Sequence, residues 1–201
     1  MKVSEAVKIT GSMTRTSKMP GLSYSLPAWE CQVGAKLRTV KGSVCSGCYA
    51  LKGNYTRYPA IKAAQYYRLQ SLYNPQWIPA MVAQIKRQKY FRWHDAGDLQ
   101  SVQHLKNIFE VCNRTPGTKH WLPTREVRYT RLMDPATVPT NLKIIISDHM
   151  IDQETPVKSW PYTSGVSTKS ATCPAPSQGG KCGSCRQCWD RNVARVVYGK
   201  H

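Results

Sequence analysis

The sequence is short of acidic residues. Eleven Asp and Glu stand against 29 Lys and Arg among 201 residues, which gives a formal net charge of +18. A surface this basic attracts nucleic acid, nucleotides or other anions. A solvated surface that only aids solubility is the alternative interpretation. Thiolates bound to a metal would cancel part of this charge, because the count treats each cysteine as neutral.

Long hydrophobic runs are also lacking. The opening stretch "MKVSEAVKITGSMTR" interrupts every apolar run with Lys, Glu or Gly, so it has no signal-peptide core, and no segment suits a membrane span. We therefore expect a cytoplasmic protein with no membrane partner. In that reducing compartment eight cysteines favour metal binding or catalysis over disulfides. The 41% hydrophobic content suffices for a core without cross-links.

Strand-like and helix-like segments alternate along the chain. Apolar and turn patterns predict strands at 21–27, 90–94, 118–125, 141–150 and 162–168, and helices at 59–73, 75–88, 98–117 and 127–134. This order predicts an α/β fold with a mainly parallel sheet. We expect an α/β domain over 1–168, irregular or edge structure in its first 22 residues, and a loop-rich cysteine segment over 169–201 packed on it. "CWDRNVARVVY" is expected to form a final short helix.

Four cysteines gather in the C-terminal segment, in "CPAPSQGGKCGSCRQC". Their C-x2-C-x2-C run has the spacing that holds three corners of a [4Fe–4S] cluster, and a remote cysteine followed by Pro174 completes the set. A structural zinc ribbon is the alternative, although zinc ribbons more often show two separated C-x2-C pairs. The predicted ligands are Cys173, Cys182, Cys185 and Cys188.

Three further cysteines form a second group, Cys31-x13-Cys45-x2-Cys48. Three thiolates on a cubane leave one iron open to a substrate or cofactor, whereas a closed structural site needs four ligands. The alternative is a Cys3His zinc site completed by His94 or His149. A fourth sulfur from Cys112 is disfavoured, because this cysteine continues the apolar stripe of a helix.

Polar residues follow three predicted strands, in "RWHDAGD", "WLPTR" and "ISDHM". Ligands of parallel α/β sheets collect at the carboxyl ends of strands, so these residues are candidates for one site. Asp98 has a competing role as a helix cap. The candidate catalytic residues are Arg92, Asp98 and Arg125. The candidate cofactor-binding residues are Gly97, Asp98, Thr124 and Ser147.

Taken in order, "YSLPAWEC", "CSGCYALKG", "FRWHDAGD", "WLPTR" and "CPAPSQGGKCGSCRQCW" resemble the phage gene-product-88 family over roughly residues 21–189. That family is itself distantly similar to radical-SAM-like proteins. The resemblance implies a partial (β/α) barrel, cluster ligation by Cys31, Cys45 and Cys48, and a cofactor role for Gly97-Asp98 after the second strand. The first cysteine gap is thirteen residues here, where radical SAM enzymes have three.

The expected function is that of a phage-encoded iron–sulfur protein with two [4Fe–4S]-type sites in the host cytoplasm. A radical-SAM-like enzyme that uses S-adenosylmethionine on a nucleotide, nucleic acid or other anion is one form of this hypothesis. The alternative is a non-enzymatic, metal-stabilised basic protein that binds nucleic acid or a host protein. Tyr66, Tyr67 and Tyr73 show helical spacing, which is more typical of packing than of base stacking. The sequence does not decide whether the protein is an enzyme, and it does not predict an oligomeric state.

Overall fold

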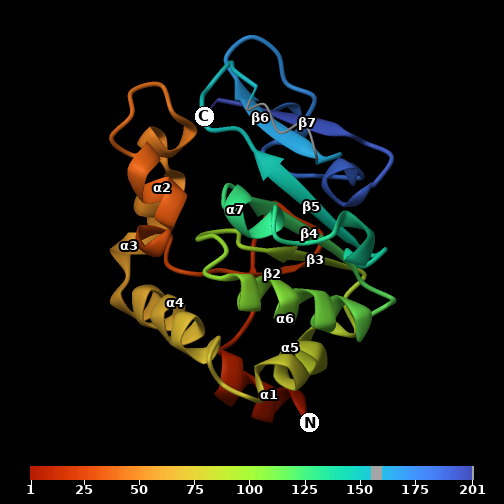
Figure 1. Ribbon diagram of the computed structural model, residues 1–201. Helices are drawn as coiled ribbons and strands as arrows, with labels where there is room; N and C mark the ends of the chain where they lie inside the picture. The colour runs from red at the N-terminus through yellow and green to blue at the C-terminus, as the bar shows by residue number, and fades with distance from the viewer. Residues whose placement is uncertain (155–159, 201) are drawn as a thin grey trace.

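A seven-stranded sheet forms the centre of the molecule (Figure 1). The computed structural model describes residues 1–154 and 160–200. The strand order follows the chain, and every neighbouring pair except the antiparallel β1–β2 is parallel. The sheet is open, with β1 and β7 at its edges, and it confirms the predicted mainly parallel α/β fold. The strands are β1 Thr14–Arg15, β2 Leu22–Tyr24, β3 Tyr90–Trp93, β4 Lys119–Thr124, β5 Leu142–Ser147, β6 Thr163–Ser167 and β7 Arg195–Gly199.

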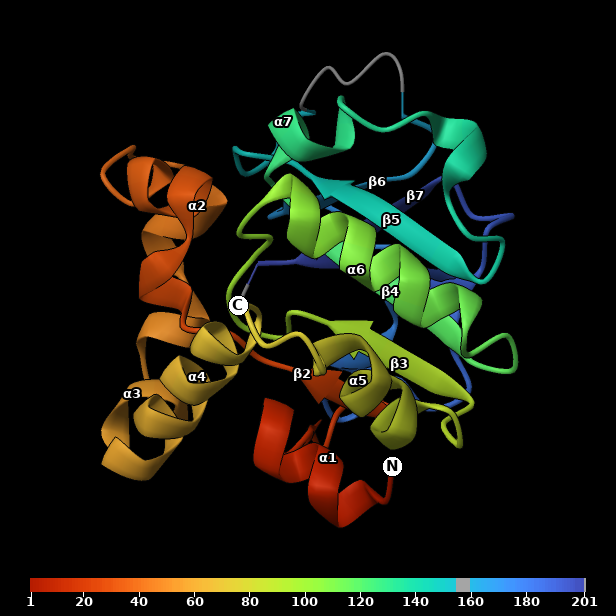
Figure 2. The same cartoon turned by 60° about the horizontal axis from the view of Figure 1, so that its bottom comes forward.

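The helices divide into two groups. Helices α1, α5 and α6 cover one face of the sheet, whereas α2, α3 and α4 stand together beyond one end of its strands (Figure 2). No helix in the described ranges has the length and apolar character needed to traverse a bilayer. The helices are α1 Val3–Thr10, α2 Gln32–Leu37, α3 Asn54–Arg57, α4 Pro59–Ser71, α5 Trp77–Ile85, α6 Val102–Asn113 and α7 Val127–Thr130.

The main core lies between the sheet and helices α5 and α6. Alternate residues of the strands point to this face, where Phe91, Trp93 and Leu122 are fully buried against α5 and α6 residues such as Trp77 and Leu105. Every residue of β5, in the β-branched run "LKIIIS", is buried, as expected of a central parallel strand. The burial of both faces of β5 therefore requires a second layer opposite the helices.

That second layer is the C-terminal segment between β6 and β7. Its Trp189 packs on Trp121 and Ile145, and the indole Nε1 donates to the carbonyl of Phe91 at 2.9 Å. The ammonium of Lys143 donates to the carbonyl oxygens of Gln187, Asp190 and Val193 at 2.7–2.8 Å. These bonds hold the cysteine-rich segment directly on the sheet.

Both ends of the chain differ from the sequence prediction. The first residues include an amphipathic helix, α1, followed by the expected edge strand β1. The final expected helix is wrong, because Arg195–Gly199 forms β7 and pairs in parallel with β6. The N-cap of α6 is Ser101, whose hydroxyl accepts from the His104 amide at 3.0 Å, so Asp98 does not cap this helix.

Candidate functional site

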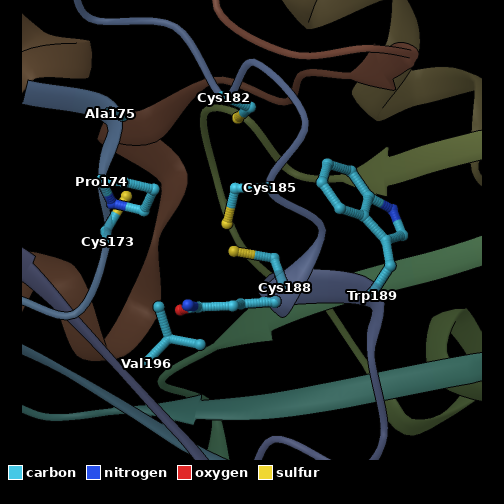
Figure 3. Close-up of a pocket in the computed structure, with 9 residues that line it drawn as sticks. Cys173, Pro174, Ala175, Cys182, Cys185, Cys188, Trp189 and Val196 are labelled. Atoms are coloured by element: carbon cyan, nitrogen blue, oxygen red, sulfur yellow. The ribbon is translucent and has the colours of Figure 1, made fainter. Parts of the chain in front are cut away.

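The four C-terminal cysteines line one small cavity (Figure 3). Their side chains surround a common space, and the sulfur atoms of Cys185 and Cys188 point toward one another. None of the cysteines is in a disulfide. The rest of the lining is mostly apolar, which leaves sulfur as the main donor type. The cavity is lined by Cys173, Pro174, Ala175, Cys182, Cys185, Gln187, Cys188, Trp189 and Val196.

Backbone bonds from three parts of the chain fix this cavity. The Cys173 amide donates to the carbonyl of Val197 in β7 at 3.0 Å, and the Cys182 amide donates to the carbonyl of Lys18 at 2.8 Å. The Cys185 amide closes the C-x2-C turn on the Cys182 carbonyl at 2.9 Å. Gly183 sits inside this turn at a φ of 52°, a left-handed conformation that favours glycine. The C-x2-C spacing of Cys182 and Cys185 therefore forms a tight turn, and backbone hydrogen bonds hold that turn in place.

Burial and nearby donors act in opposite directions on these thiols. Burial raises the pKa of Cys188 to about 11, while the Tyr198 hydroxyl, whose oxygen lies 3.3 Å from Sγ, and the Arg92 guanidinium act to lower it. Burial likewise raises the pKa of Cys182. Such thiols keep their protons in the metal-free protein, so a metal that binds them as thiolates releases protons.

Arg92 lies near the C-terminal cysteines, where its charge acts on Cys182 and Cys188, rather than with the residues at the strand ends. It lies within β3, and its guanidinium stacks at 4.4 Å over the ring of Trp121 on the face covered by the C-terminal segment. Nη1 lies 3.6 Å from the sulfur of Met19, and the buried Nε has no hydrogen-bond partner among the described residues. A buried guanidinium with so few partners is suited to a neighbouring anionic group.

The other three cysteines lie in one loop region beyond the strand ends. Cys31 precedes α2, while Cys45 and Cys48 lie in and after a 3₁₀ turn over Val44–Gly47. Gly34 of α2 faces two of the thiols, because a methyl group there would lie 3.7 Å from the Sγ atoms of both Cys31 and Cys45. The same methyl group would lie 2.9 Å from Cys31 Cβ, which is closer than packed side chains allow. Only glycine leaves the space beside these two sulfur atoms unfilled, and we call this space the cradle at Gly34.

Hydrogen bonds attach this loop to the carboxyl ends of three strands. After β3, the hydroxyl of Tyr55 donates to the carboxylate of Asp95 at 3.0 Å, and the Tyr49 hydroxyl donates to the Asp95 carbonyl. After β4, the amide of Val33 donates to Glu126 at 2.8 Å. After β5, the amide of Val44 donates to the carbonyl of His149 at 2.9 Å. The cysteine loop therefore covers the edge of the sheet where the sequence predicts a site.

Asp98, Thr124 and Arg125 meet at this edge. The Asp98 carboxylate accepts from the Thr124 hydroxyl at 2.6 Å and from the amides of Leu99 and Arg125 at 2.7 and 2.9 Å. Burial raises the pKa of Asp98 to about 6, against the effect of these three donors. Its negative charge also contributes to raising the pKa of Cys31, after the larger effect of burial. This acid and the cysteine loop therefore influence each other electrostatically.

The remaining predicted residues occupy distinct places. Ser147, at the end of β5, accepts from the Ser164 hydroxyl at 3.2 Å. Gly97 has a φ of 82°, and a methyl group there would lie 2.6 Å from Leu26 Cβ, so close packing of the backbone requires glycine. Arg125 extends away from Asp98 and donates through Nε to the carbonyl of Asp148 at 3.1 Å. The structure thus groups Asp98, Thr124 and Arg125, and it separates Arg92 from them.

The donors of both cysteine groups are thiols. No three His, Cys, Asp or Glu side chains within 1–154 and 160–200 are arranged to hold one metal ion. A tetrahedral ion with metal–sulfur bonds of about 2.3 Å would need sulfur atoms roughly 3.8 Å apart. A [4Fe–4S] core binds each thiolate to a different iron, so its ligands stand further apart. The all-sulfur donor set around the C-terminal cavity and the cradle at Gly34 are compatible with that larger group.

Comparison with known proteins gives one match. A model of the family described as gene product 88 matches residues 2–191. No curated protein and no solved structure matches the chain significantly. The matched range includes both cysteine groups and the strand ends.

Proposed function

The chain belongs to the gene product 88 family, and we propose that it is a phage-encoded iron–sulfur protein with two [4Fe–4S]-type sites. The observation that supports this proposal is the grouping of seven cysteines, four around one cavity on the sheet and three close together in the loop beyond the strand ends. The C-terminal group offers four thiolates and makes a closed site. The N-terminal group offers three and leaves one coordination position for another ligand.

The chain's own residues would serve the two sites differently. When bound, the clusters would supply one-electron chemistry and, at the three-cysteine site, an open iron. Around the C-terminal site, Arg92 and Tyr198 would stabilise negative charge on the thiolates. Beneath the three-cysteine loop, Asp98 and Thr124 would hold the Arg125 backbone in place, and Arg125 would orient an anionic ligand.

We further propose that the open site takes S-adenosylmethionine or an anionic substrate such as a nucleotide. Parallel strands in chain order, with a cysteine loop over their carboxyl ends, are compatible with a partial (β/α) barrel of the radical-SAM kind. The backbone at Gly97-Asp98 and the side chains of Thr124 and Ser147 are the proposed contacts of that ligand. The thirteen-residue gap before Cys45 would make this site a variant of the usual three-cysteine motif.

The decisive experiment is anaerobic purification with iron and sulfide analysis, followed by electron paramagnetic resonance of the reduced protein with and without S-adenosylmethionine. We expect about eight irons per chain, and a spectrum that changes when S-adenosylmethionine binds the open iron. Cys45→Ala and Cys185→Ala should each remove one cluster. Cys112→Ala is the matched control, because Cys112 is buried in the main core. Stoichiometric zinc in colourless protein would overturn the proposal.

A second candidate function is supported by the charge and by the surface of α4. This is a non-enzymatic protein whose metal sites stabilise a basic surface that binds nucleic acid. The two functions differ in one measurement, because only the enzyme cleaves S-adenosylmethionine reductively. Loaded clusters without that cleavage would favour the binding protein.

A further inference from the structure

The exposed apolar side chains of this protein are concentrated in one stretch. Of the nine large apolar residues exposed in the described part of the chain, five are tyrosines between positions 49 and 73. Tyr73 is 86% exposed and Tyr58 is 48% exposed, so neither packs in a core. Tyr66 and Tyr67 are also exposed, although Tyr66 packs partly against Trp29 and the Tyr67 hydroxyl donates to the carbonyl of Lys8. Exposed aromatic rings gathered on one face require another explanation.

Helical spacing aligns part of this set into a row. Lys62 and Tyr66 are four residues apart in α4 and so share one face, and Tyr58, the N-cap residue of α4, lies four residues before Lys62. Trp29 extends the row sideways, since its ring centroid lies 5.6 Å from that of Tyr66. The ammonium of Lys62 lies 6.0 Å from the Trp29 ring centroid, so aromatic and cationic groups alternate on this face. We call these four residues, together with Tyr73 two positions after the end of α4, the α4 face.

The charge around the α4 face is of one sign. No Asp or Glu occurs in the sequence between Glu30 and Asp95. Lys52, Arg57 and Lys62 are exposed beside the tyrosines. Glu30 is the acidic exception at the margin, where the Tyr66 hydroxyl donates to its carboxylate at 3.3 Å. A partner of this face should therefore be a polyanion that also presents flat, stackable rings.

The α4 face adjoins the three-cysteine loop. Trp29 lies two residues before Cys31, and Tyr49 follows Cys48 directly. Figure 1 shows α2, α3 and α4 as one group at the side of the sheet. A chain molecule that lies along α4 would therefore reach the proposed open site.

We propose that the α4 face binds single-stranded nucleic acid, with bases stacked on the tyrosines and phosphates beside the lysine and arginine side chains. The 13 residues of α4 span about 20 Å, which accommodates roughly three or four nucleotides of an extended strand. Bases are available for stacking in a single strand, whereas a duplex hides them. The inference rests on the proposed function only in assigning the bound strand to the three-cysteine site.

The test is fluorescence anisotropy with labelled poly-dT and poly-rU oligonucleotides of about 12 nucleotides, across a series of salt concentrations. The full chain, purified anaerobically, should bind both strands more tightly than a duplex of equal length. The double variant Tyr58→Ala/Tyr73→Ala should weaken binding by roughly tenfold to a hundredfold, from the loss of two stacking rings. Tyr58→Phe/Tyr73→Phe is the matched control and should bind like the wild type, because it keeps the rings and neither hydroxyl forms a hydrogen bond with another residue in 1–154 or 160–200.

The phosphate contacts have their own matched pair. Lys62→Glu should weaken binding and reduce the slope of log Kd against log salt concentration. Lys106→Glu makes the same charge change on the exposed side of α6 and should have a much smaller effect. Equal losses in the two variants would show that net charge alone drives binding, and would overturn the assignment to α4.

Two further results would contradict the proposal: tighter binding to duplex, or unchanged binding by the tyrosine-to-alanine variant. Failure of the cluster hypothesis gives a different signature. Protein that lacks iron but binds single strands through Tyr58, Lys62 and Tyr73 would retain the α4 face and lose the iron–sulfur proposal. Iron-loaded protein that binds no single strand at low salt would support the iron–sulfur proposal and contradict the nucleic-acid proposal for the α4 face.

Discussion

Gly34 leaves open the space where the thiols of Cys31 and Cys45 approach each other. Gly34→Ala would place a methyl group in that space and should displace Cys31, because the two Cβ atoms would otherwise be 2.9 Å apart. We expect the three-cysteine site to lose most of its iron, up to about half of the total per chain. Iron and sulfide assays on the anaerobically purified variant measure this directly.

Gly47→Ala is the control for that substitution. Gly47 lies in the turn between Cys45 and Cys48, and a methyl group there would have no atom within 4 Å. The iron content should therefore stay at the wild-type value. An equal loss in both variants would mean that the loop tolerates no side chain, and that the cradle at Gly34 is not special.

Arg92 leads to a prediction about the reduction potential. Reduction adds negative charge to a cluster, and the guanidinium beside the C-terminal cysteines stabilises that charge. Arg92→Gln should lower the midpoint potential of this site by roughly 50–100 mV, which corresponds to an interaction of about 1–2 kcal/mol in a protein interior. Arg92→Lys should retain most of the potential. A redox titration followed by electron paramagnetic resonance compares the three proteins.

Among single residues, the sequence correctly predicts the positions of those that lie close together along the chain. Cys182, Cys185 and Cys188 fall on one turn and line one cavity as their separation predicts. Arg92 was predicted with the strand-end residues, and its actual position depends on which face of β3 it occupies. Gly34 and Tyr198 carry no local signal, because their importance comes from sulfur atoms that only the fold brings near.

The element that most distinguishes this fold is the segment between β6 and β7, which replaces a second layer of helices. Lys143 anchors it by donating to three carbonyl groups from a position in β5 that is 1% exposed. Lys143→Met should remove all three bonds, and the Gln187 and Asp190 carbonyls then keep only their longer backbone bonds of 3.2 Å, so we expect the protein to be destabilised by about 2–4 kcal/mol. Urea unfolding measures this change, and faster hydrogen exchange should be concentrated in residues 168–194.

Lys119→Met in the neighbouring strand provides the comparison. Lys119 is exposed at the start of β4, so its substitution should change stability by no more than about 0.5 kcal/mol. Similar losses in both variants would show that the carbonyl contacts of Lys143 do not anchor the segment.

Most elements could be predicted from periodicity, and the exceptions have a common cause. The helices α4 to α6 and the strands β3 to β6 have strong local patterns. The stretch that ends in "ARVVYG" is short, and pairing with β6 rather than local preference makes it a strand. Helix α1 was not predicted, because it has few apolar residues and its packing against α5 is a tertiary contact that the local sequence does not show.

The molecule as a whole should be sensitive to acid. Burial lowers the pKa of His104 and of His120 to about 3, whereas an exposed histidine titrates near 6.5. Below pH 6.5 the unfolded chain therefore takes up protons that the folded chain does not, and each histidine costs about 2 kcal/mol of stability by pH 5. The raised pKa of Asp98, about 6, acts oppositely and restores about 1 kcal/mol as the folded chain binds a proton.

Urea unfolding at pH 7.5 and pH 5 tests this balance. These three groups together give an expected loss of about 3 kcal/mol at the lower pH, and the lowered pKa of buried His94 adds to that loss. His104→Phe keeps a ring against Trp77 and removes one titrating group, so it should lose about 2 kcal/mol less over the same interval. Stability that rises on acidification would show that these histidines are protonated in the folded state.

Strand β3 and the turn after it touch both cysteine groups. Arg92 faces the C-terminal thiols, and Asp95, three residues further on, is held by Tyr49 and Tyr55 of the other loop. Three residues of fully extended chain would cover roughly 10 Å, and the left-handed φ of 55° at His94 shortens the actual span. If both sites hold clusters, the short separation along this strand would allow electron transfer between them. A reductant that reaches only one cluster would then also reduce the other. Freeze-quenched spectra taken after a rapid reductant pulse would reveal that transfer as one signal decaying while the second grows.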